Sequence, residues 1–505
     1  MASDLSRWIS HRADWSPERT AIRFEGTDVT YAALDTRVRR LAALLAADYG
    51  IGAGDRIAHL GLNSPLVLEL LFACARLEAI LVPLNWRLAP PEHREILLDC
   101  TPKALFVEPE FRAHVDGIRK DLGALAIVNC GGAPSEPPAF EERAAALAGV
   151  EPPGAGELSS PLLLVYTSGT TGRPKGVLLT QNALFWNAVN SIAAHDLTSA
   201  DHVLTVLPMF HVGGLNIHTT PALHAGARVT LHRRFDAARA LAAIAEDRPT
   251  MLLAVPQVSL AMIGHPTWAS TDLSSLRLVA TGSSIVPESA IRPWLERGVP
   301  VTQVYGLTES APVAVCLRRE DAARKIGSYG KPAIHCEARI VDDEGRDVET
   351  NRAGEIWLRG PSLFREYWND PAATAAAFSG GWFRTGDVGH RDEEGFFYVD
   401  DRKKDVIISG GENVYPAELE GVLAAAPTIL EAAVVGRTDP RWGEVPVACV
   451  VPRPGSGLTE DGVMALFAGR LARFKHPRAV VFLESLPRNV MGKVLKHDLR
   501  ARINA

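Results

Sequence analysis

"PLLLVYTSGTTGRPKGV", residues 161–177, joins an apolar run to a stretch of small polar residues. The run at 161–165 has the length and composition of a buried strand, and the residues after it hold four Ser or Thr hydroxyls, three glycines and one lysine. Glycine reaches backbone angles that aim several N–H groups at one point, and such a concavity binds anions. The stretch therefore predicts a loop that holds the phosphates of ATP. Its expected members are Thr167, Ser168, Gly169, Thr170, Thr171, Gly172 and Lys175.

This loop differs from a Walker P-loop, in which the lysine precedes Ser or Thr. Here Lys175 stands between Pro174 and Gly176. A solvated Gly/Thr turn is the alternative interpretation of the short string "SGTTG". The longer string "TSGTTGRPKG", residues 167–176, is far more specific, and it favours a nucleotide site.

Strand and helix patterns alternate on both sides of the loop. Residues 29–64 indicate a strand, an amphipathic helix, a Gly turn and a second strand, with Leu41, Leu44 and Leu45 at helical spacing. Further short apolar strands follow the loop, at 202–210, 227–232, 250–256, 276–282 and 301–306. Alternation of this kind predicts parallel sheets covered by helices.

The pattern of predicted helices and strands changes from about residue 335. Strands are then joined by acidic Gly turns with no helices between them, which predicts an antiparallel sheet or a small barrel. The last hundred residues return to helices and strands, as in a compact α+β domain. Because single cores stop growing at roughly 250–300 residues, a chain of 505 residues is expected to form at least two domains. We place the boundary between 1–401 and 402–505.

Composition and charge exclude several classes of protein. The hydrophobic fraction is 47%, the charged fraction is 22% and the net charge is −6, so no global attraction to nucleic acid or to anionic membranes is expected. The six cysteines form no C-x-x-C pair, which argues against a zinc site or a disulfide framework. No secretion signal and no transmembrane run is visible, so we expect a cytoplasmic protein with buried, reduced cysteines.

Five motifs appear in a fixed order along some two thirds of the chain. They are "TSGTTGRPKG" at 167–176, "VYGLTES" at 304–310, "GWFRTGD" at 381–387, "DRKKDVIISGGENVYPAELE" at 401–420 and "PRNVMGKVLK" at 487–496. This ordered set resembles the adenylate-forming superfamily of acyl- and aryl-CoA synthetases, luciferases and peptide-synthetase adenylation domains. The resemblance implies a multidomain α/β fold: a large N-terminal domain of αβ layers with a small β-barrel, and a smaller mobile α+β C-terminal domain.

The resemblance also assigns the nucleotide contacts. It implies that Tyr305 stacks on the adenine, that Thr308 bonds a phosphate oxygen and that Asp387 accepts hydrogen bonds from the ribose. Glu309 would hold Mg²⁺, a hard cation that takes carboxylate and phosphate oxygens. Taken singly, such residues are more often core or turn residues, and only the ordered set reverses that preference. The remaining implied contacts are Gly282, Ser283 and Ser284 along the adenine, Gly306 beside Tyr305, Arg402 near the ribose and Thr167 near the metal.

Lys493 is the implied catalytic cation. A carboxylate that attacks the α-phosphate brings two anions together, and a lysine on a long stem stabilises the charge that builds up. Lys496 is expected to be an ordinary solvated lysine. The family motif places a pivot at Lys404, so that the C-terminal domain swings between acyl-AMP formation and thiol attack.

Coenzyme A is the expected thiol. Gly410 and Gly411 permit a thin pantetheine arm to pass close to the backbone, and Trp442 would pack against it. A basic cluster could meet the phosphates of CoA, although a solvated helix face is the plainer interpretation; its members are Arg470, Arg473, Lys475 and Arg478. Arg87 is a weaker candidate for the same role.

The acid is the least defined substrate. The segments 211–218, 279–282 and 310–315 carry few charges, with His211 as the chief polar group and with Gly213 and Gly214 expected to leave room. They predict an apolar monocarboxylic acid and disfavour diacids and amino acids. A medium or long fatty acid is preferred, and an aromatic acid of the benzoate or cinnamate type is the alternative. His211 is either a gate beside the thiol tunnel or a core histidine.

The expected function is therefore an ATP- and Mg²⁺-dependent carboxylic acid–CoA ligase. Its expected partners are the free acid, ATP and CoA, with no nucleic acid and an undetermined oligomeric state. Two rivals remain open: a stand-alone adenylation enzyme that loads a carrier protein, and a nucleotide-binding relative without catalysis.

Overall fold

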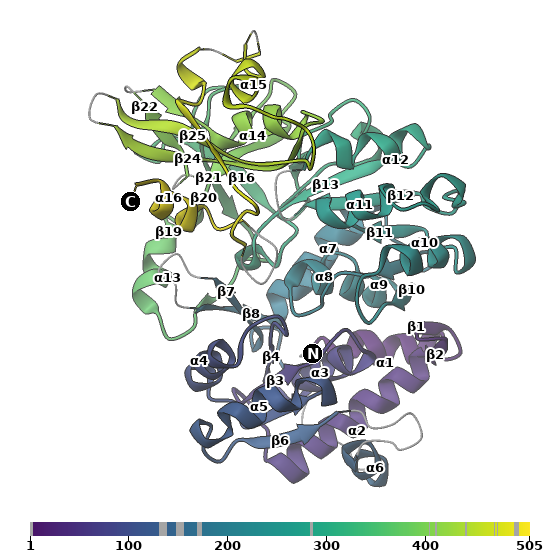
Figure 1. Cartoon of the computed structure of the whole chain (residues 1–505). Coiled ribbons are helices and arrows are strands. Elements are labelled where there is room, and N and C mark those ends of the chain that lie inside the picture. The colour runs from purple at the N-terminus through teal and green to yellow at the C-terminus, as the bar shows by residue number, and fades with distance from the viewer. Residues whose placement is uncertain are drawn as a thin grey trace. The chain divides into compact units, whose positions relative to one another are not determined.

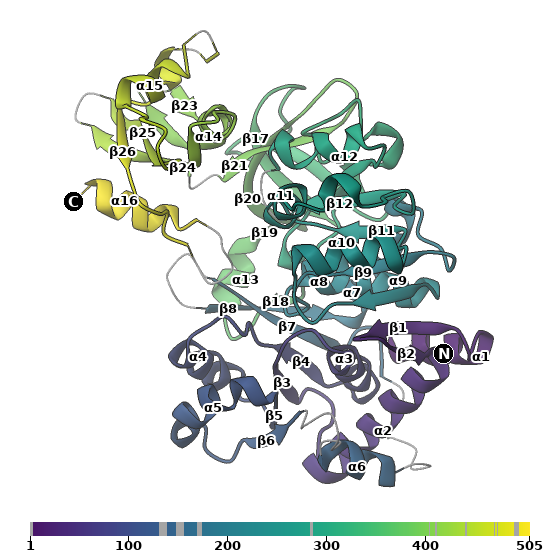
Figure 2. The ribbon, with the colours of Figure 1, turned by 45° about the vertical axis from the view of Figure 1, so that its right-hand side comes forward.

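The computed structural model describes residues 4–130, 139–147, 156–168, 174–282, 286–402, 405–409, 412–439, 442–468, 470–471, 473–488 and 494–504 (Figure 1, Figure 2). Its contacts divide the chain into two compact units. The N-terminal unit comprises Met1–Val286, Ala290–Ala338 and Leu358–Phe383, and the C-terminal unit comprises Pro287–Ser289, Arg339–Trp357 and Arg384–Ala505. The domain boundary expected between residues 401 and 402 stays a prediction.

The larger sheet of the N-terminal unit has nine strands in the order β15-β14-β13-β12-β11-β9-β10-β1-β2. The strands from β13 to β1 run parallel, while β14, β15 and β2 pair antiparallel at the two edges. Their bounds are β1 Thr20–Phe24, β2 Thr27–Thr30, β9 His202–Thr205, β10 Arg228–Leu231, β11 Met251–Leu253, β12 Leu278–Gly282, β13 Val301–Tyr305, β14 Val315–Cys316 and β15 Lys331–Pro332.

The second sheet of this unit has seven strands in the order β18-β8-β7-β4-β3-β5-β6. Strands β7, β4, β3, β5 and β6 run parallel, β8 is antiparallel to β7, and β18 is antiparallel to β8. The predicted parallel sheets are therefore confirmed. The bounds are β3 Arg56–Leu60, β4 Ile80–Pro83, β5 Ala104–Val107, β6 Ala126–Asn129, β7 Pro161–Ser168, β8 Pro174–Thr180 and β18 Glu366–Tyr367.

Helix α2, Tyr31–Tyr49, shows how the sequence sets these elements. The hydroxyl of Thr30 accepts a hydrogen bond from the Ala33 N–H at 3.2 Å, which caps the first turn, and Gly50 ends the helix at φ +59°. The expected apolar positions 41, 44 and 45 are buried. Figure 1 shows α7 to α12 flanking the strands of the larger sheet. The other helices of this unit are α1 Ser6–Trp15, α3 Pro65–Leu77, α4 Pro90–Cys100, α5 Arg112–Ile118, α6 Ala139–Ala146, α7 Gln181–His195, α8 Val212–Asn216, α9 Thr219–Ala225, α10 Ala237–Glu246, α11 Pro256–Ile263, α12 Arg292–Glu296 and α13 Pro371–Ala377.

A five-stranded sheet begins near residue 335, where the pattern of predicted elements changes. Its order is β16-β17-β20-β19, with β21 on β20, and the β19–β20 and β20–β21 pairs are antiparallel. An antiparallel sheet was one of the two forms expected here. The bounds are β16 Glu337–Val341, β17 Gly354–Arg359, β19 Phe378–Ser379, β20 Trp382–Arg391 and β21 Phe397–Arg402.

The rest of the C-terminal unit is built on the long antiparallel pair β24–β25. Successive residues of β24 point to opposite faces: Val434 packs with Leu419 and Phe467 of one core, and Val435 packs with Leu499 of another. Helices therefore cover both faces of the sheet. The elements are β22 Ile407–Ser409, β23 Glu412–Val414, α14 Pro416–Ala424, β24 Ile429–Asp439, β25 Gly443–Pro452, α15 Glu460–Ala465, β26 Ala479–Phe482 and α16 Lys496–Asn504.

None of the described helices is both long enough and apolar enough to cross a bilayer. All six cysteines are free thiols with buried side chains, as expected for small apolar core residues.

Candidate active site

The antiparallel hairpin β7–β8 flanks the expected phosphate loop. Thr167 is the partner of Lys175 in this ladder, Ser168 is the partner of Pro174, and the Thr167 hydroxyl donates to the Lys175 carbonyl at 3.3 Å. The tip of the loop, with Gly169, Thr170, Thr171 and Gly172, lies outside the described residues, as does the side chain of Ser168. The hairpin therefore places the two ends of the loop next to each other, where β7 ends and β8 begins.

Lys175 and Glu309 are brought together by a residue that the sequence analysis missed. The Lys175 ammonium lies 3.6 Å from the centre of the Tyr367 ring, and the Tyr367 hydroxyl donates to Oε1 of Glu309 at 2.9 Å. Burial and the Glu309 charge raise the pKa of Tyr367, so the phenol stays protonated. Tyr367 belongs to the two-residue strand β18, which is too short for its periodicity to show in the sequence. The motif order alone gave no signal for it.

Gly282 and Tyr305 end two neighbouring parallel strands. Gly282 of β12 is the partner of Val304 in the parallel strand β13, so the two strands end side by side at the carboxyl edge of the sheet. Ligands of open α/β sheets bind at such carboxyl edges. Tyr305 is 7% exposed, and its ring meets Tyr329 edge-on at 5.9 Å. Ser283 and Ser284 lie outside the described residues.

The segment after Tyr305 is held by close backbone packing. A Cβ on Gly306 would lie 1.6 Å from the Pro312 carbonyl oxygen, so this position accepts only glycine. Thr308 and Glu309 follow in a short 3-10 helix, Thr308–Ser310, and the Glu309 carbonyl accepts from the Phe364 N–H at 2.7 Å. Thr308, Glu309 and Lys175 are thus gathered in the N-terminal unit.

The residues present fit one Mg²⁺ ion. Among the described residues, no three His, Cys, Asp or Glu side chains gather in a group that could hold a metal ion. Mg²⁺ needs no such cluster, because it is commonly bound by one or two carboxylates together with substrate phosphates and waters. The Glu309 carboxylate accepts a hydrogen bond from Tyr367 at Oε1, and a carboxylate group can bind a cation while it accepts such a bond.

His211 immediately precedes α8 and packs against Phe210, with ring centres 4.4 Å apart. Burial lowers the pKa of His211 to about 4, and the positive charge of Arg87 adds to the effect. Its Nε2 atom has no hydrogen-bond partner among the described residues. Arg87 itself lies over the Trp86 ring at 4.5 Å. The imidazole is therefore neutral at physiological pH.

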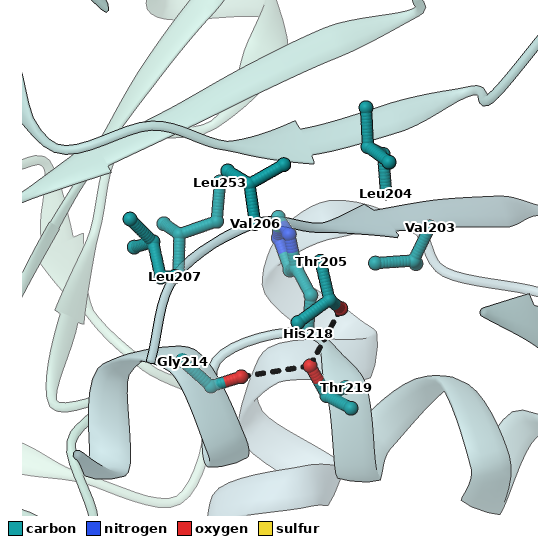
Figure 3. Close-up of a pocket in the computed structure, with 9 residues that line it drawn as sticks. All are labelled: Val203, Leu204, Thr205, Val206, Leu207, Gly214, His218, Thr219 and Leu253. Carbon is teal, nitrogen blue, oxygen red and sulfur yellow. Dashed lines mark hydrogen bonds between the residues drawn. The ribbon is translucent and has the colours of Figure 1, made fainter. Parts of the chain in front are cut away.

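A small cavity lies beside the segment 211–218 (Figure 3). Its volume is about 10 Å³, which is room for one water molecule and not for an acyl group. A Cβ on Gly214 would lie 2.3 Å from the Pro208 carbonyl oxygen, so this glycine permits close packing rather than leaving room as expected. The cavity is lined by Val203, Leu204, Thr205, Val206, Leu207, Gly214, His218, Thr219 and Leu253.

The C-terminal unit places Asp387 and Arg402 opposite each other. They are partners in the β20–β21 ladder, although the Arg402 side chain lies outside the described residues. Asp387 is 5% exposed and follows Gly386, which has φ +70° and whose N–H donates to Glu355 at 3.2 Å. The Asp387 N–H donates to the Thr385 hydroxyl at 3.1 Å, which fixes the turn.

The expected CoA residues are only partly described. Trp442 is 37% exposed, its N–H donates to Asp439 at 3.0 Å, and the Arg478 guanidinium lies 5.7 Å from its ring. Lys475 forms an ion pair with Glu418 at 2.6 Å. Gly410, Gly411 and the expected pivot Lys404 lie outside the described residues.

Lys493 also lies outside the described residues, in a segment that follows Arg488 and precedes Val494, which form a β-bridge. Lys496, expected to be solvated, instead pairs with Glu420 at 2.9 Å, and its side chain is only 18% exposed. Burial alone would lower the pKa of Lys496, but Glu420 and the nearby Asp401 outweigh it and raise the pKa. Lys496 therefore has a structural partner.

The sequence matches two family models. Residues 9–368 match "AMP-binding enzyme", and residues 418–493 match "AMP-binding enzyme C-terminal domain". The chain is 52% identical over 500 residues to the indoleacetate–CoA ligase of Aromatoleum aromaticum, with 98% of each chain covered. It is 42% identical to a feruloyl-CoA synthase of Amycolatopsis sp, with 99% of each covered, and 38% identical to a long-chain-fatty-acid–CoA ligase of Mycobacterium tuberculosis, with 98% of each covered.

Solved structures extend the similarity to the whole fold. The o-succinylbenzoate CoA synthetase of Bacillus subtilis, in complex with ATP and magnesium ion, superimposes with a TM-score of 0.85 at 33% identity, covering 97% of this chain and 98% of that one. The predicted fold class, enzyme class and requirement for ATP, Mg²⁺ and CoA are confirmed. The chain belongs to the AMP-binding enzyme family, in which it is an AMP-forming acid–CoA ligase.

Proposed function

We propose that the acid is an aromatic monocarboxylic acid with an arylacetate or cinnamate skeleton. The observation that carries this is the 52% identity, over 98% of both chains, to an indoleacetate–CoA ligase, compared with 38% to a fatty-acid ligase. The proposal therefore takes up the alternative of the sequence analysis rather than its preference for a fatty acid.

The packing beside His211 does not separate the two classes of acid. In the segment 211–218 the backbone at Gly214 touches Pro208, and the neighbouring cavity measures about 10 Å³, which is too small for an aromatic ring as well as for an acyl chain. The identity to the indoleacetate–CoA ligase therefore carries the proposal by itself.

The first half-reaction is assigned to residues from each of the two units. The loop with Thr167 and Lys175 would hold the phosphates, Thr308 would bond a phosphate oxygen, and Glu309 would hold Mg²⁺, which supplies positive charge beside the phosphates. Lys493 would stabilise the charge that builds as the carboxylate oxygen attacks the α-phosphorus and pyrophosphate leaves. The remaining nucleotide contacts proposed are Ser168, Gly169, Thr170, Thr171, Gly172, Gly282, Ser283, Ser284, Tyr305, Gly306, Asp387 and Arg402.

The second half-reaction follows a swing at Lys404 that brings Gly410, Gly411 and Trp442 to the pantetheine arm. The CoA thiolate attacks the acyl carbon and AMP leaves. His211 is neutral, so it can border the thiol path without attracting the anionic acid. The six buried free thiols suit the reducing cytoplasm, where we propose that the enzyme works.

The acid is tested by ATP–pyrophosphate exchange with a panel of indoleacetate, cinnamate, benzoate, hexanoate and palmitate, repeated as AMP release with CoA. We expect kcat/KM for the preferred aromatic acid to exceed that for palmitate by about tenfold or more. A higher value for palmitate would overturn the aromatic proposal. AMP release that does not depend on CoA would instead point to a carrier protein as acceptor.

The proposed roles of Lys493 and Lys404 in the C-terminal unit are tested by one variant of each residue. Lys493→Ala should slow acyl-AMP formation by about a hundredfold or more, while Lys120→Ala, at an exposed lysine, should not change it. Lys404→Pro should spare acyl-AMP formation and slow thioester formation. Equal loss in both half-reactions would contradict the pivot.

A further inference from the structure

Tyr367 contacts two groups of opposite charge at once. Its ring face lies 3.6 Å from the Lys175 ammonium, and its hydroxyl lies 2.9 Å from Glu309 Oε1. The two charged residues come from segments far apart in the sequence, and Tyr367 comes from a third. No motif of the sequence analysis includes it. It is also 8% exposed, so solvent screens these two interactions only weakly.

Backbone pairing fixes the position of Tyr367. Strand β18 joins β8 through hydrogen bonds from the Arg365 N–H to the Leu178 carbonyl at 2.9 Å and from the Trp368 N–H to the Gly176 carbonyl at 2.8 Å. The Tyr367 N–H donates to the Thr374 hydroxyl at 2.9 Å. β18 is thus paired with the strand that follows the phosphate loop, so backbone hydrogen bonds fix the Tyr367 ring relative to that strand.

The Glu309 side of the contact is held as well. Phe364 packs on the Tyr367 ring at a centre distance of 4.7 Å, and its N–H donates to the Glu309 carbonyl. One short segment therefore fixes both the backbone of Glu309 and one oxygen of its carboxylate. An ionised carboxylate only accepts hydrogen bonds, so the phenol must be the donor.

We propose that Tyr367 is a positioning residue for adenylation, which acts through Lys175 and Glu309. Its hydroxyl orients the Glu309 carboxylate toward Mg²⁺, and its ring seats the Lys175 ammonium until the phosphates of ATP arrive. A cation–π contact is weaker than a contact with phosphate oxygens, so the lysine is released when ATP binds. This inference rests on the nucleotide roles proposed above for Lys175 and Glu309.

The two contacts are separated by two substitutions. Tyr367→Phe keeps the ring and removes the hydroxyl, so the Mg²⁺ concentration for half-maximal pyrophosphate exchange should rise about tenfold, with KM for ATP changed less than about threefold. Tyr367→Leu removes both contacts, so KM for ATP should also rise by about fivefold. A matched control is Tyr398→Phe in the C-terminal unit, which likewise removes a tyrosine–carboxylate contact, to Asp392 at 3.4 Å, and should leave both values unchanged.

Binding is measured separately from activity. Calorimetric titration of a non-hydrolysable ATP analogue at several Mg²⁺ concentrations should show the same loss of Mg²⁺ dependence in Tyr367→Phe, with an unchanged melting temperature. In the Glu309→Gln background, Tyr367→Phe should add almost nothing, because the hydroxyl acts through that carboxylate.

Unchanged Mg²⁺ dependence in Tyr367→Phe, or a full additive effect in the Glu309→Gln background, would overturn the positioning role. Absence of exchange by the wild-type enzyme with every acid would count against the proposed function alone. The calorimetric titration would still decide the role of Tyr367. If Tyr367→Leu does not fold, Tyr367→Phe and the double variant still decide it.

Discussion

Gly306 in the N-terminal unit and Gly386 in the C-terminal unit both belong to nucleotide motifs, but their surroundings differ. A Cβ on Gly306 would lie 1.6 Å from the Pro312 carbonyl oxygen, whereas a Cβ on Gly386 would meet no atom within 4 Å. Gly386 is required instead by its φ of +70°. The first glycine allows two backbone segments to touch, and the second allows one segment to turn.

The titratable side chains of the two units also differ. The N-terminal unit packs its backbone closely at Gly306, and it buries histidines such as His59 and His195, whose pKa values burial lowers to about 4. The C-terminal unit uses the ion pair between Lys496 and Glu420 and the contact of His390 with Asp400. His59 and His195 are therefore neutral at physiological pH, whereas His390 lies beside a carboxylate that favours its charged form.

The largest effect is expected for Gly306→Ala. A side chain at 1.6 Å from a carbonyl oxygen forces the 305–312 backbone to move, so unfolding free energy should fall by about 4 kcal/mol or more, with loss of acyl-AMP formation. Urea unfolding and pyrophosphate exchange measure both. A variant that keeps normal stability and exchange would show that this approach is not needed.

Lys496→Met should cost the C-terminal unit about 3 kcal/mol, because it leaves the Glu420 carboxylate without its partner at 2.9 Å. The double variant Lys496→Met/Glu420→Gln should recover part of that loss, and urea unfolding of both variants checks it. Equal stability of the wild-type protein and Lys496→Met would mean that the pair is not a stabilising contact of this unit.

The two units should respond oppositely to pH. Burial lowers the pKa of His59, His195 and His202 to about 4, so below pH 6.5 the unfolded chain takes up protons that the folded chain does not. Together they should cost the N-terminal unit about 2 kcal/mol between pH 7 and pH 6.

The hydrogen bond that His390 donates to the Asp400 carboxylate raises the pKa of His390. Its contribution is therefore complete below pH 6.5 and is lost as the pH rises through the raised value. Hydrogen exchange resolved by segment should show β9 and β3 losing protection between pH 7 and pH 6 while β20 and β21 keep theirs. Parallel loss in all four strands would refute the contrast.

Gly386→Ala should have the smallest effect, about 1 kcal/mol of unfolding free energy, because only the strain of a positive φ opposes the methyl group. Acyl-AMP formation should continue, with KM for ATP changed through the neighbouring Asp387. A loss as large as that of Gly306→Ala would remove the distinction between a packed glycine and a turn glycine.

Patterns along the chain were sufficient to predict the class of protein. Alternating strand and helix patterns predicted the two parallel sheets, because these periodicities are local, and the ordered motifs predicted an ATP-dependent acid–CoA ligase. The sequence also predicted the apolar strand that leads into the phosphate loop, whereas the hairpin formed by β7 and β8 was found only in the structure.

The contacts between distant side chains could be found only in the folded chain. Tyr367 stands 58 residues from Glu309, and the register of a two-residue strand on β8 brings it to Lys175, so no pattern along the chain could show it. Gly214 was expected to leave room for an acyl group, but its backbone packs closely against the Pro208 carbonyl. Lys496 was expected to be solvated, but it forms an ion pair with Glu420. Residue type fixes what a side chain can do, whereas burial and partners depend on segments that meet only when the chain folds.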